Sequence, residues 1–452
     1  MYGLKITGAS MVGALQRHGH DVVACDDIID DAKVELATSL GVRLLPAPDD
    51  AAALIQGFDL LSPAPGVPET HPIILAAQAA DVPVRSEIEI AYRWEQERSA
   101  GPRPILAITG TDGKTTTTML TVEILRAAGL RTEALGNTEI PLVDAIDDDL
   151  DVFVVECTSF RLAWTQQFRA EAAVWLNLAP DHLNWHHAMA SYEAAKARIF
   201  ELQRPTDVAI GFAGDPVVQH HLERAPSRHR TFGRSHADYH LDGSMLMSPF
   251  GPITDIAVMR RRLPHDITNA LAASALVLET GLATPADIAR ALATFVSPPH
   301  RIEPVGEFAG VNWFNDSKAT TPHAASIAIR AFESLVLIAG GSRKGVDLSP
   351  MGVDSDRVRV VIATGEAAPD IRAVFEGSTE VVEAESMAAA VELASQFAQP
   401  GDAVVLSPGC ASFDWYNGYP ARGDDFRQLV QAHIQHQIEQ HQIDKQQLEA
   451  RS

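Results

Sequence analysis

The stretch Ala107–Leu120, AITGTDGKTTTTML, decides how the centre of this chain folds. A short apolar run at Pro104–Ile108 enters a glycine-rich turn, and apolar residues then recur at helical spacing. This order predicts a strand, a phosphate-binding loop and a helix, because backbone N–H groups at a helix N-terminus bind phosphate oxygens. The spacing is shorter than in the general P-loop pattern, so the loop by itself indicates nucleotide phosphate rather than one particular reaction.

The residues expected to bind ATP form this turn and the start of the helix: Gly110, Thr111, Asp112, Gly113, Lys114, Thr115 and Thr116. Lys114 is expected to reach the terminal phosphates and Thr115 to ligate Mg²⁺. Glu156 closes another apolar run, and its carboxylate offers magnesium a second hard oxygen ligand. A strand-end acid is often only a solvated charge, so this prediction depends on the ordered strand, turn and helix beside it.

Composition restricts the class of protein. The 452 residues allow roughly three domains. The formal net charge of -23 argues against a nucleic-acid partner, although local basic sites can still bind small anions. Cys25, Cys157 and Cys410 lie far apart without metal-ligand spacing, which predicts reduced core residues. No stretch suits a signal peptide or a bilayer span, so we expect a cytoplasmic protein without a membrane partner.

Two proline-containing breaks, SAGPRP at Ser99–Pro104 and SPPHR at Ser297–Arg301, divide the chain. They predict an N-terminal domain at 1–99, a central domain at 104–297, a C-terminal domain at 298–430 and a polar tail at 431–452. Unbroken apolar runs between helical patterns predict parallel sheets covered on both faces, and therefore an α/β fold. These runs are Val152–Val155, Ala173–Leu176, Val208–Phe212, Leu335–Ala339, Arg359–Ala363 and Ala403–Leu406.

The two ends of the chain carry less regular patterns. GLKITGASMVGALQRHG, from Gly3, looks like a nucleotide-type glycine turn with its helix, followed by a strand at Val22–Cys25. Such a turn needs a strand before it, and only Met1 and Tyr2 precede it, so we expect that the first strand is missing or that translation starts upstream. The tail is rich in Gln and His, and a solvated extension, helical or disordered, is favoured over a metal site.

Further motifs follow the loop and Glu156 in one order: LNLAPDHLNWH, YEAAKARIF, LPHDITNALAA, PPHRIE, WFNDSKAT and LSPGCASFDWYNGY. Together they resemble the Mur ligase family of peptidoglycan synthesis over about the whole chain except the tail. The most discriminating pieces are NDSKAT at Asn315–Thr320 and LSPGCASF at Leu406–Phe413. The resemblance implies a Rossmann-like N-terminal domain for the UDP end of the substrate, a P-loop ATPase domain with a parallel sheet, and a Rossmann-like C-terminal domain.

The resemblance also implies residue roles. It makes Lys114, His182, Lys196 and Lys318 catalytic, with Glu156 on one Mg²⁺ and His182 on a second. Lys196 matches a lysine carried as a carbamate, which presents an anionic oxygen where an ammonium would repel Mg²⁺. Further implied contacts are Asn269, Arg301 and Asp316 for ATP; Asn137, Thr158 and Ser159 for the muramoyl substrate; and Thr320, Lys344, Ser412 and Tyr419 for glutamate.

The chain departs from the family pattern at several positions near the implied site. Arg161 stands in TSFRL where the family usually has SSFQL, and Thr321 follows DSKAT in place of asparagine. Asn184 replaces a common aspartate, Asp266 replaces a common asparagine, and Arg343 is added beside the implied glutamate site. These changes concern substrate recognition more than the ATP chemistry.

The activity implied by the resemblance is an ADP-forming amide ligase that uses ATP and Mg²⁺ at two sites. It would join D-glutamate to UDP-N-acetylmuramoyl-L-alanine through an acyl phosphate, as a monomer. Cations and hydroxyls at the glutamate site select an acidic amino acid over a diamino acid, but not its enantiomer. Alternatives are the same mechanism with L-glutamate or another acceptor, or an inactive nucleotide-binding relative. Folate ligases are disfavoured by NDSKAT and LSPGCASF, and inactivity by the intact lysines.

Overall fold

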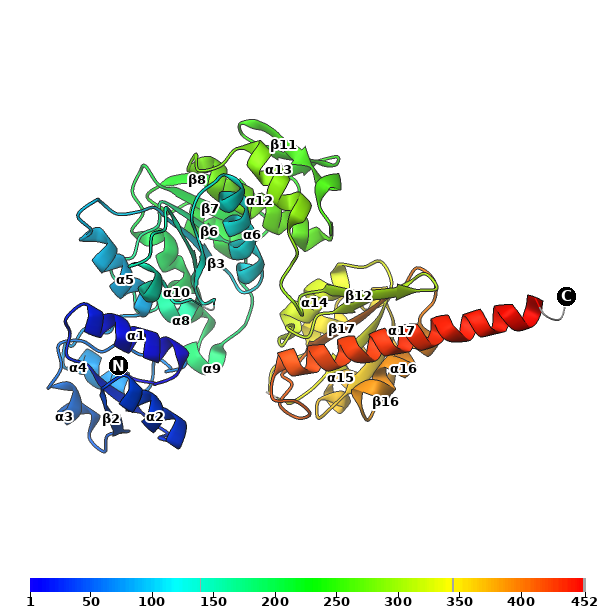
Figure 1. Ribbon diagram of the computed structural model, residues 1–452, viewed down its shortest axis with the longest axis horizontal. Coiled ribbons are helices and arrows are strands. Elements are labelled where there is room, and N and C mark those ends of the chain that lie inside the picture. The colour runs from blue at the N-terminus through cyan, green and yellow to red at the C-terminus, as the bar shows by residue number, and fades with distance from the viewer. Residues whose placement is uncertain (139, 344, 450–452) are drawn as a thin grey trace. The chain divides into compact units, whose positions relative to one another are not determined.

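The computed structural model describes residues 1–138, 140–343 and 345–449, apart from the side chains of Asn184 and 444–449 (Figure 1). The chain forms two compact units, one made of Met1–Arg262 and Asp266–Phe295, the other of Leu263–His265 and the chain from Val296 on. Both units are mixed α/β structures built on largely parallel sheets, which confirms the predicted fold class.

The N-terminal part of the first unit is a small α/β layer. Its elements are α1 (Ile6–Arg17), β1 (Val23–Asp26), α2 (Asp31–Ser39), β2 (Arg43–Pro46), α3 (Ala51–Ile55), α4 (Pro72–Ala79) and α5 (Glu87–Gln96). Strands β1 and β2 pair in parallel. Tyr2 bridges to Cys25 on one side and to Pro63 on the other, so the residues before Gly3 occupy the position of the strand that the glycine turn requires. That an upstream start exists stays a prediction.

The central sheet of the first unit has six parallel strands in the order β4-β5-β3-β6-β7-β8. Its strands are β3 (Ile105–Thr109), β4 (Ala134–Gly136), β5 (Phe153–Glu156), β6 (Ala172–Trp175), β7 (Val208–Phe212) and β8 (Arg228–Phe232). Its helices are α6 (Lys114–Ala127), α7 (Leu142–Ala145), α8 (Ser159–Leu162), α9 (Leu183–His186), α10 (Met189–Glu201), α11 (Pro216–Leu222), α12 (Pro264–Glu279) and α13 (Pro285–Thr294). A three-stranded sheet, β9 (His240–Asp242), β10 (Met245–Ser248) and β11 (Gly251–Asp255), follows β8. The apolar runs predicted as strands in this region therefore form β5, β6 and β7.

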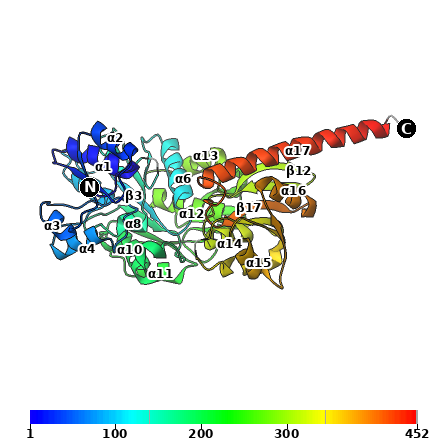
Figure 2. The ribbon, with the colours of Figure 1, turned by 90° about the horizontal axis from the view of Figure 1, so that it is seen from below.

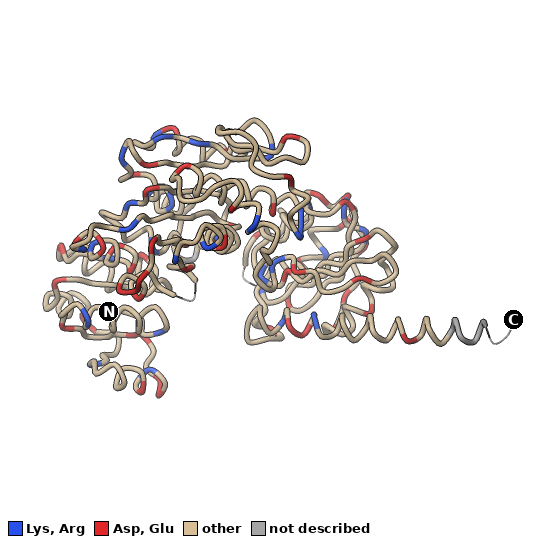
Figure 3. The backbone as a smooth tube through the Cα atoms, turned by 45° about the horizontal axis from the view of Figure 1, so that its top comes forward, with Lys and Arg blue, Asp and Glu red and all other residues tan. Residues whose placement is uncertain are grey.

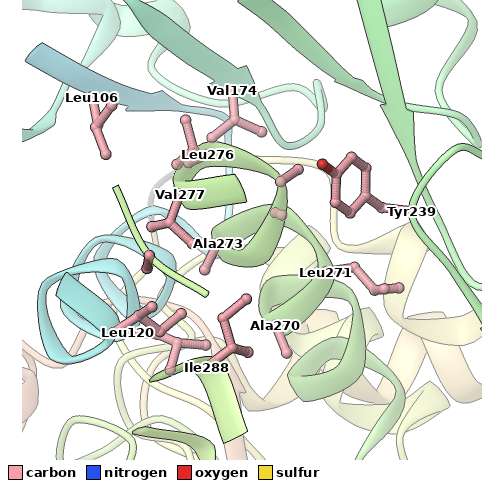
Figure 4. Close-up of a cluster of buried hydrophobic side chains, with 14 of the residues drawn as sticks. Leu106, Leu120, Val174, Tyr239, Ala270, Leu271, Ala273, Leu276, Val277 and Ile288 are labelled. Carbon is pink, nitrogen blue, oxygen red and sulfur yellow. The ribbon is translucent and has the colours of Figure 1, made fainter. Parts of the chain in front are cut away.

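Apolar side chains cover both faces of the central sheet. On one face, residues of α6, α12 and α13 pack against Leu106 and Val174 (Figure 4). On the other face, residues of α1, α5, α7 and α10 pack against Phe153 and Val155. Because burial on both faces removes apolar side chains from water, the strands read as continuous apolar runs in the sequence.

The second unit repeats the theme with a six-stranded sheet in the order β12-β13-β17-β14-β15-β16. Its strands are β12 (Glu303–Phe308), β13 (Val311–Asn315), β14 (Leu335–Gly340), β15 (Val358–Thr364), β16 (Glu380–Ala384) and β17 (Ala403–Gly409). Its helices are α14 (Pro322–Arg330), α15 (Ala368–Phe375), α16 (Met387–Phe397) and α17 (Tyr419–Glu449). Strand β12 is antiparallel to β13, and the remaining pairs are parallel.

The predicted polar tail continues α17, which runs unbroken to Glu449 and extends beyond the sheet of its own unit in two views (Figures 1 and 2). Acidic and basic residues are interspersed along both units, so cationic positions occur despite the net negative charge (Figure 3). The cysteines Cys25, Cys157 and Cys410 are buried and unpaired by disulfides, as predicted. No helix in the described part of the chain has the length and apolar character that a membrane span requires.

The packing of α12 gives a test of the core. Leu276 is fully buried in the cluster between α12 and the central sheet. We expect Leu276→Ala to lower the free energy of unfolding by ~2–5 kcal/mol, because it removes buried methyl groups and leaves a cavity. Leu202→Ala is the matched control, since Leu202 is 45% exposed. Thermal unfolding of both variants checks this, and an equal loss in both would contradict the assigned core.

Candidate active site

The predicted phosphate loop joins β3 to α6 at the carboxyl edge of the central sheet. Gly113 is the N-cap of α6 with a φ of 83°, in the left-handed region that glycine adopts without steric cost. A Cβ at this position would lie 2.9 Å from Oδ1 of Asn269, so the predicted adenine-contacting asparagine packs against the loop. The first turn of α6 contains no acidic residue, which leaves its N–H groups and positive dipole end suited to phosphate.

Lys114 and Asn177 determine the shape of the loop. The Lys114 Nζ donates to the carbonyl oxygens of Gly110 and Thr111 at 2.9 and 2.7 Å. The Asn177 Oδ1 accepts from the backbone N–H groups of Thr111 and Asp112, both at 2.9 Å, and its Nδ2 donates to the Asp112 carbonyl at 3.2 Å. Asn177 was not predicted as a site residue, although its place directly after the β6 run was a usable signal.

Lys196 lies directly beneath the phosphate loop, where α10 faces the end of β3. Its side chain is 1% exposed, and Nζ donates to the Gly110 carbonyl at 2.6 Å. Burial, and secondarily the ammonium of Lys114, hold the pKa of Lys196 well below its usual range. No carboxylate in the described residues forms an ion pair with it, which makes Lys196 unlike a solvated surface lysine.

Glu156 ends β5, the strand beside β3, and Ile108 is its partner in register. Its Oε1 accepts from Asn137 Nδ2 at 2.8 Å, while its Oε2 is buried and has no hydrogen-bond partner. A buried carboxylate oxygen without a donor is costly unless a cation completes it. This orphaned oxygen at the phosphate loop fits a Mg²⁺ ligand. Thr115, the other predicted ligand, is half-buried in the first turn of α6.

His182 follows β6 by a short loop in the same edge region. Its ring lies 4.6 Å from that of Phe160, and its Nε2 is 3.2 Å from Asp181 Oδ2. Tyr192 connects this group to the phosphate loop, because its hydroxyl is 3.1 Å from Thr111 Oγ1 and its ring lies 4.7 Å from Lys196 Nζ. Within the described residues, no group of at least three His, Cys, Asp or Glu is gathered as a metal site, so a cation here needs other oxygen donors as well.

The residues predicted for the muramoyl substrate lie beside Glu156. Thr158 caps α8 by accepting from the Arg161 N–H, and the Ser159 hydroxyl is buried without a hydrogen-bond partner. Arg161, which replaces the family's glutamine, is 4% exposed and donates to Asn137 Oδ1 at 2.8 Å. The first unit therefore brings the loop, Glu156, Lys196, Asn269 and this substrate group together at one sheet edge.

The second unit gathers its own predicted residues. Lys318 Nζ donates to the Tyr419 hydroxyl at 2.7 Å, and Asp316 accepts from Ser407 Oγ at 2.8 Å. Thr320 follows Lys318 in the same turn, and Ser412 is buried in the loop after β17. Arg301 is half-buried at the start of this unit, whereas Lys344 lies outside the described residues.

Arg422 is a residue of the second unit that sequence reasoning missed. It is 3% exposed, and it donates to the Ser317 hydroxyl and carbonyl and to the carbonyls of Cys410 and Ala411. It therefore connects the NDSKAT motif to the LSPGCASF loop. Its position in ARGDDF, in the first turn of a polar helix, gave no signal, because an arginine there is usually solvated.

Three departures from the family pattern have local explanations. Asp266, which replaces asparagine, forms an ion pair with Arg261 at 2.6 Å. Thr321 keeps a capping side chain, since its hydroxyl accepts from the Ala324 N–H at the start of α14. Arg343 pairs with Asp370 at the surface.

Taken together, the glycine turn at a helix N-terminus, the orphaned carboxylate oxygen and the buried lysine define a nucleotide-binding α/β protein of the phosphate-loop class. A family model described as the Mur ligase middle domain matches residues 108–277, and one described as the Mur ligase glutamate ligase domain matches residues 300–410. The chain belongs to the Mur ligase family.

Similar proteins extend this match along the chain. A UDP-N-acetylmuramoylalanine--D-glutamate ligase from Frankia casuarinae is 38% identical over 447 residues, covering 95% of this chain and 93% of its own. The protein of the same name from Mycolicibacterium smegmatis is 35% identical and covers 96% of both chains. Among solved structures, UDP-N-acetylmuramate-alanine ligase MurC from Thermotoga maritima has 18% identity and a TM-score of 0.58, covering 96% of this chain and 98% of its own. MurF from Acinetobacter baumannii has 19% identity and a TM-score of 0.59, covering 95% and 90%. These two likenesses describe the fold.

The loop geometry predicts a role for Asn177 in nucleotide binding. We expect Asn177→Ala to raise the dissociation constant for ATP roughly 10-fold, because hydrogen bonds that hold a binding loop in place are each worth about 1 kcal/mol or more. Asn177→Asp keeps the acceptor and loses the donor to Asp112, so its effect should be smaller. Titration calorimetry with a non-hydrolysable ATP analogue measures both, with the exposed Asn312→Ala as control. Unchanged affinity in Asn177→Ala would refute the role.

Proposed function

We propose that this chain is an ATP-dependent amide ligase that adds D-glutamate to UDP-N-acetylmuramoyl-L-alanine in peptidoglycan precursor synthesis, with release of ADP and phosphate. The observation that carries the ATP part is the phosphate loop with Glu156 Oε2 unpartnered beside it. The choice of substrates rests on relatives of that name with more than 30% identity over nearly the whole chain. The proposal keeps the expectation of a cytoplasmic monomer.

The chemistry requires activation of a carboxylate. Amine attack on a carboxylate is slow because its charge is delocalised and oxide is a poor leaving group. Transfer of the γ-phosphoryl group of ATP to the substrate carboxylate gives an acyl phosphate, which the glutamate amine attacks to form the amide and release phosphate. The chain mostly positions groups and compensates charge.

The residues predicted for ATP and magnesium have tasks in that sequence. Lys114 releases its two loop carbonyls and binds the terminal phosphates, and Thr115 and Glu156 hold the metal. Bound Mg²⁺ supplies charge neutralisation at the transferring phosphoryl group. We infer that His182 holds a second Mg²⁺, and that Asn269, Arg301 and Asp316 contact the nucleotide.

Carbamylation of Lys196 follows from its burial. Only a neutral amine adds to CO₂, forming an N–C bond and releasing one proton, and the lowered pKa of Lys196 favours that neutral form. The product carries a carboxylate oxygen on a side chain that already lies against the Gly110 carbonyl. An anionic donor there would attract Mg²⁺, whereas an ammonium would repel it.

Lys196→Ala tests this role. We expect turnover to fall roughly 100-fold or more, because loss of groups that merely orient metal ligands already costs about 10–100-fold. Short carboxylic acids should restore part of the activity by occupying the vacated space. Glu193→Ala, on the same helix α10, is the control and should not respond to acetate. Near-normal turnover of Lys196→Ala in CO₂-free buffer would refute the carbamate.

The amino-acid specificity is tested by ADP release with UDP-N-acetylmuramoyl-L-alanine and each glutamate enantiomer in turn. We expect turnover with D-glutamate and none with L-glutamate. Lys344 and Ser412 would supply a cation and a hydroxyl to the carboxylates, and Thr320 and Tyr419 would contribute to the edge of the same glutamate site. Turnover with L-glutamate alone would contradict the assignment of D-glutamate but would leave the ligase mechanism intact. The absence of glutamate-dependent ADP release would indicate an inactive relative.

A further inference from the structure

A line of hydrogen bonds runs from the N-terminal part of the first unit to the metal-binding carboxylate. Arg161 Nε donates to Glu87 Oε1 at 2.9 Å, and its Nη1 donates to Asn137 Oδ1 at 2.8 Å. Asn137 Nδ2 then donates to Glu156 Oε1 at 2.8 Å. The side chains of Arg161 and Glu87 are 4% and 2% exposed, so the first link is a buried ion pair.

The guanidinium of Arg161 and the carboxylate of Glu156 determine which group donates and which accepts in these hydrogen bonds. A guanidinium only donates hydrogen bonds, and an ionised carboxylate only accepts them. The amide of Asn137 can face either way, because its oxygen and nitrogen ends have nearly the same shape. With Arg161 on one side, the amide must present its oxygen to the guanidinium and therefore its NH₂ group to Glu156. A glutamine at position 161 could donate or accept, so the contact with Glu156 alone would then favour this orientation of the amide.

The orientation matters because Asn137 has few other constraints. It belongs to the exposed residues of the first unit, and it follows β4 in a bend. Its NH₂ group engages Oε1 of Glu156 and leaves Oε2 as the buried oxygen without a partner. A flipped amide would instead place its oxygen against the carboxylate and repel it.

Arg161 is itself held firmly. Its backbone N–H donates to the Thr158 hydroxyl, which caps α8, and its guanidinium is fixed by the carboxylate of Glu87 at the start of α5. Glu87 is nearly fully buried, so the pair is much less screened than a surface pair. The guanidinium therefore has one preferred position, and its hydrogen bond to Asn137 Oδ1 favours one orientation of that amide.

We propose that Arg161 is a positioning residue for magnesium binding: with Glu87 as its counter-ion, it orients the Asn137 amide and thereby turns the free oxygen of Glu156 toward the metal. This rests on the proposed function, in which Glu156 holds the Mg²⁺ of the nucleotide complex. Loss of the guanidinium should weaken metal binding without changing contacts to the nucleotide itself.

The test measures the dissociation constant of Mn²⁺, used in place of Mg²⁺, by electron paramagnetic resonance with a non-hydrolysable ATP analogue bound to the full chain. We expect Arg161→Gln to raise this constant roughly 10-fold, as for other groups that orient metal ligands. The affinity for the analogue in EDTA should stay unchanged. Arg161→Lys, whose ammonium is also a donor only, should recover part of the loss.

Two further variants separate positioning from folding. Glu87→Gln/Arg161→Gln replaces the buried ion pair with two amides, so it should regain thermal stability relative to Arg161→Gln while keeping the weak Mn²⁺ binding. Arg198→Gln is the matched control, because Arg198 donates to the carbonyls of Ala163 and Thr165 and has no path to Glu156.

A double-mutant cycle decides whether Arg161 acts through Asn137. Asn137→Ala/Arg161→Gln should bind Mn²⁺ no more weakly than either single variant. Wild-type Mn²⁺ affinity in Glu87→Gln/Arg161→Gln, or effects of Arg161 and Asn137 that multiply, would overturn the proposal. The proposed function has a different test, because it would be contradicted if the unsubstituted chain released no ADP with its substrates. The Mn²⁺ measurement does not depend on turnover, so the two failures can be distinguished.

Discussion

The carboxyl ends of β3, β5 and β6 meet at one edge of a parallel sheet, and the arrangement of the first unit depends on that constraint. The phosphate loop follows β3, Glu156 ends β5, and Asn177 follows β6. Because the strands run in parallel and in register, residues far apart in the sequence become neighbours without any long connection. The Asn177 side chain, after β6, accepts hydrogen bonds from the phosphate loop after β3 and so connects the two loops.

The same edge contains a buried lysine amine and a buried carboxylate oxygen. Lys196 enters from α10, and its Nζ contacts the Gly110 carbonyl, the Thr109 hydroxyl and the ring of Tyr192. Glu156 leaves one oxygen without a partner in the same region. A buried amine of lowered pKa and an unpartnered carboxylate oxygen are both costly in an isolated protein. Their coexistence beside a phosphate loop is the pattern expected where cations and anions of a substrate complete the charge balance.

The sequence predicts the sheets well and the supporting contacts poorly, for physical reasons. Buried parallel strands have to be continuous apolar runs, so β5, β6 and β7 could be found from Val152, Ala173 and Val208. The phosphate loop could be found from the spacing of its glycine, lysine and threonine residues. The pairing of β3 with β5 places Glu156 beside that loop. Arg422 acts through carbonyls of distant segments, and no local pattern marks such contacts, whereas Asn177 could have been noticed from its place directly after β6. At the N-terminus the two residues before Gly3 are too few to show a periodicity, and the structure gives isolated bridges from Tyr2 to Cys25 and Pro63 there without a strand.

Substitution of a glutamine by an arginine in a buried site is costly unless a counter-ion is present, and this chain supplies Glu87. Glu87 belongs to α5, and Arg161 follows the strand that ends in Glu156, so the ion pair joins the N-terminal part of the unit to the edge of the central sheet. A neutral amide at position 161 would need no carboxylate at position 87, and a carboxylate at 87 without a cation would be left buried and unpaired. The two residues are therefore expected to change together.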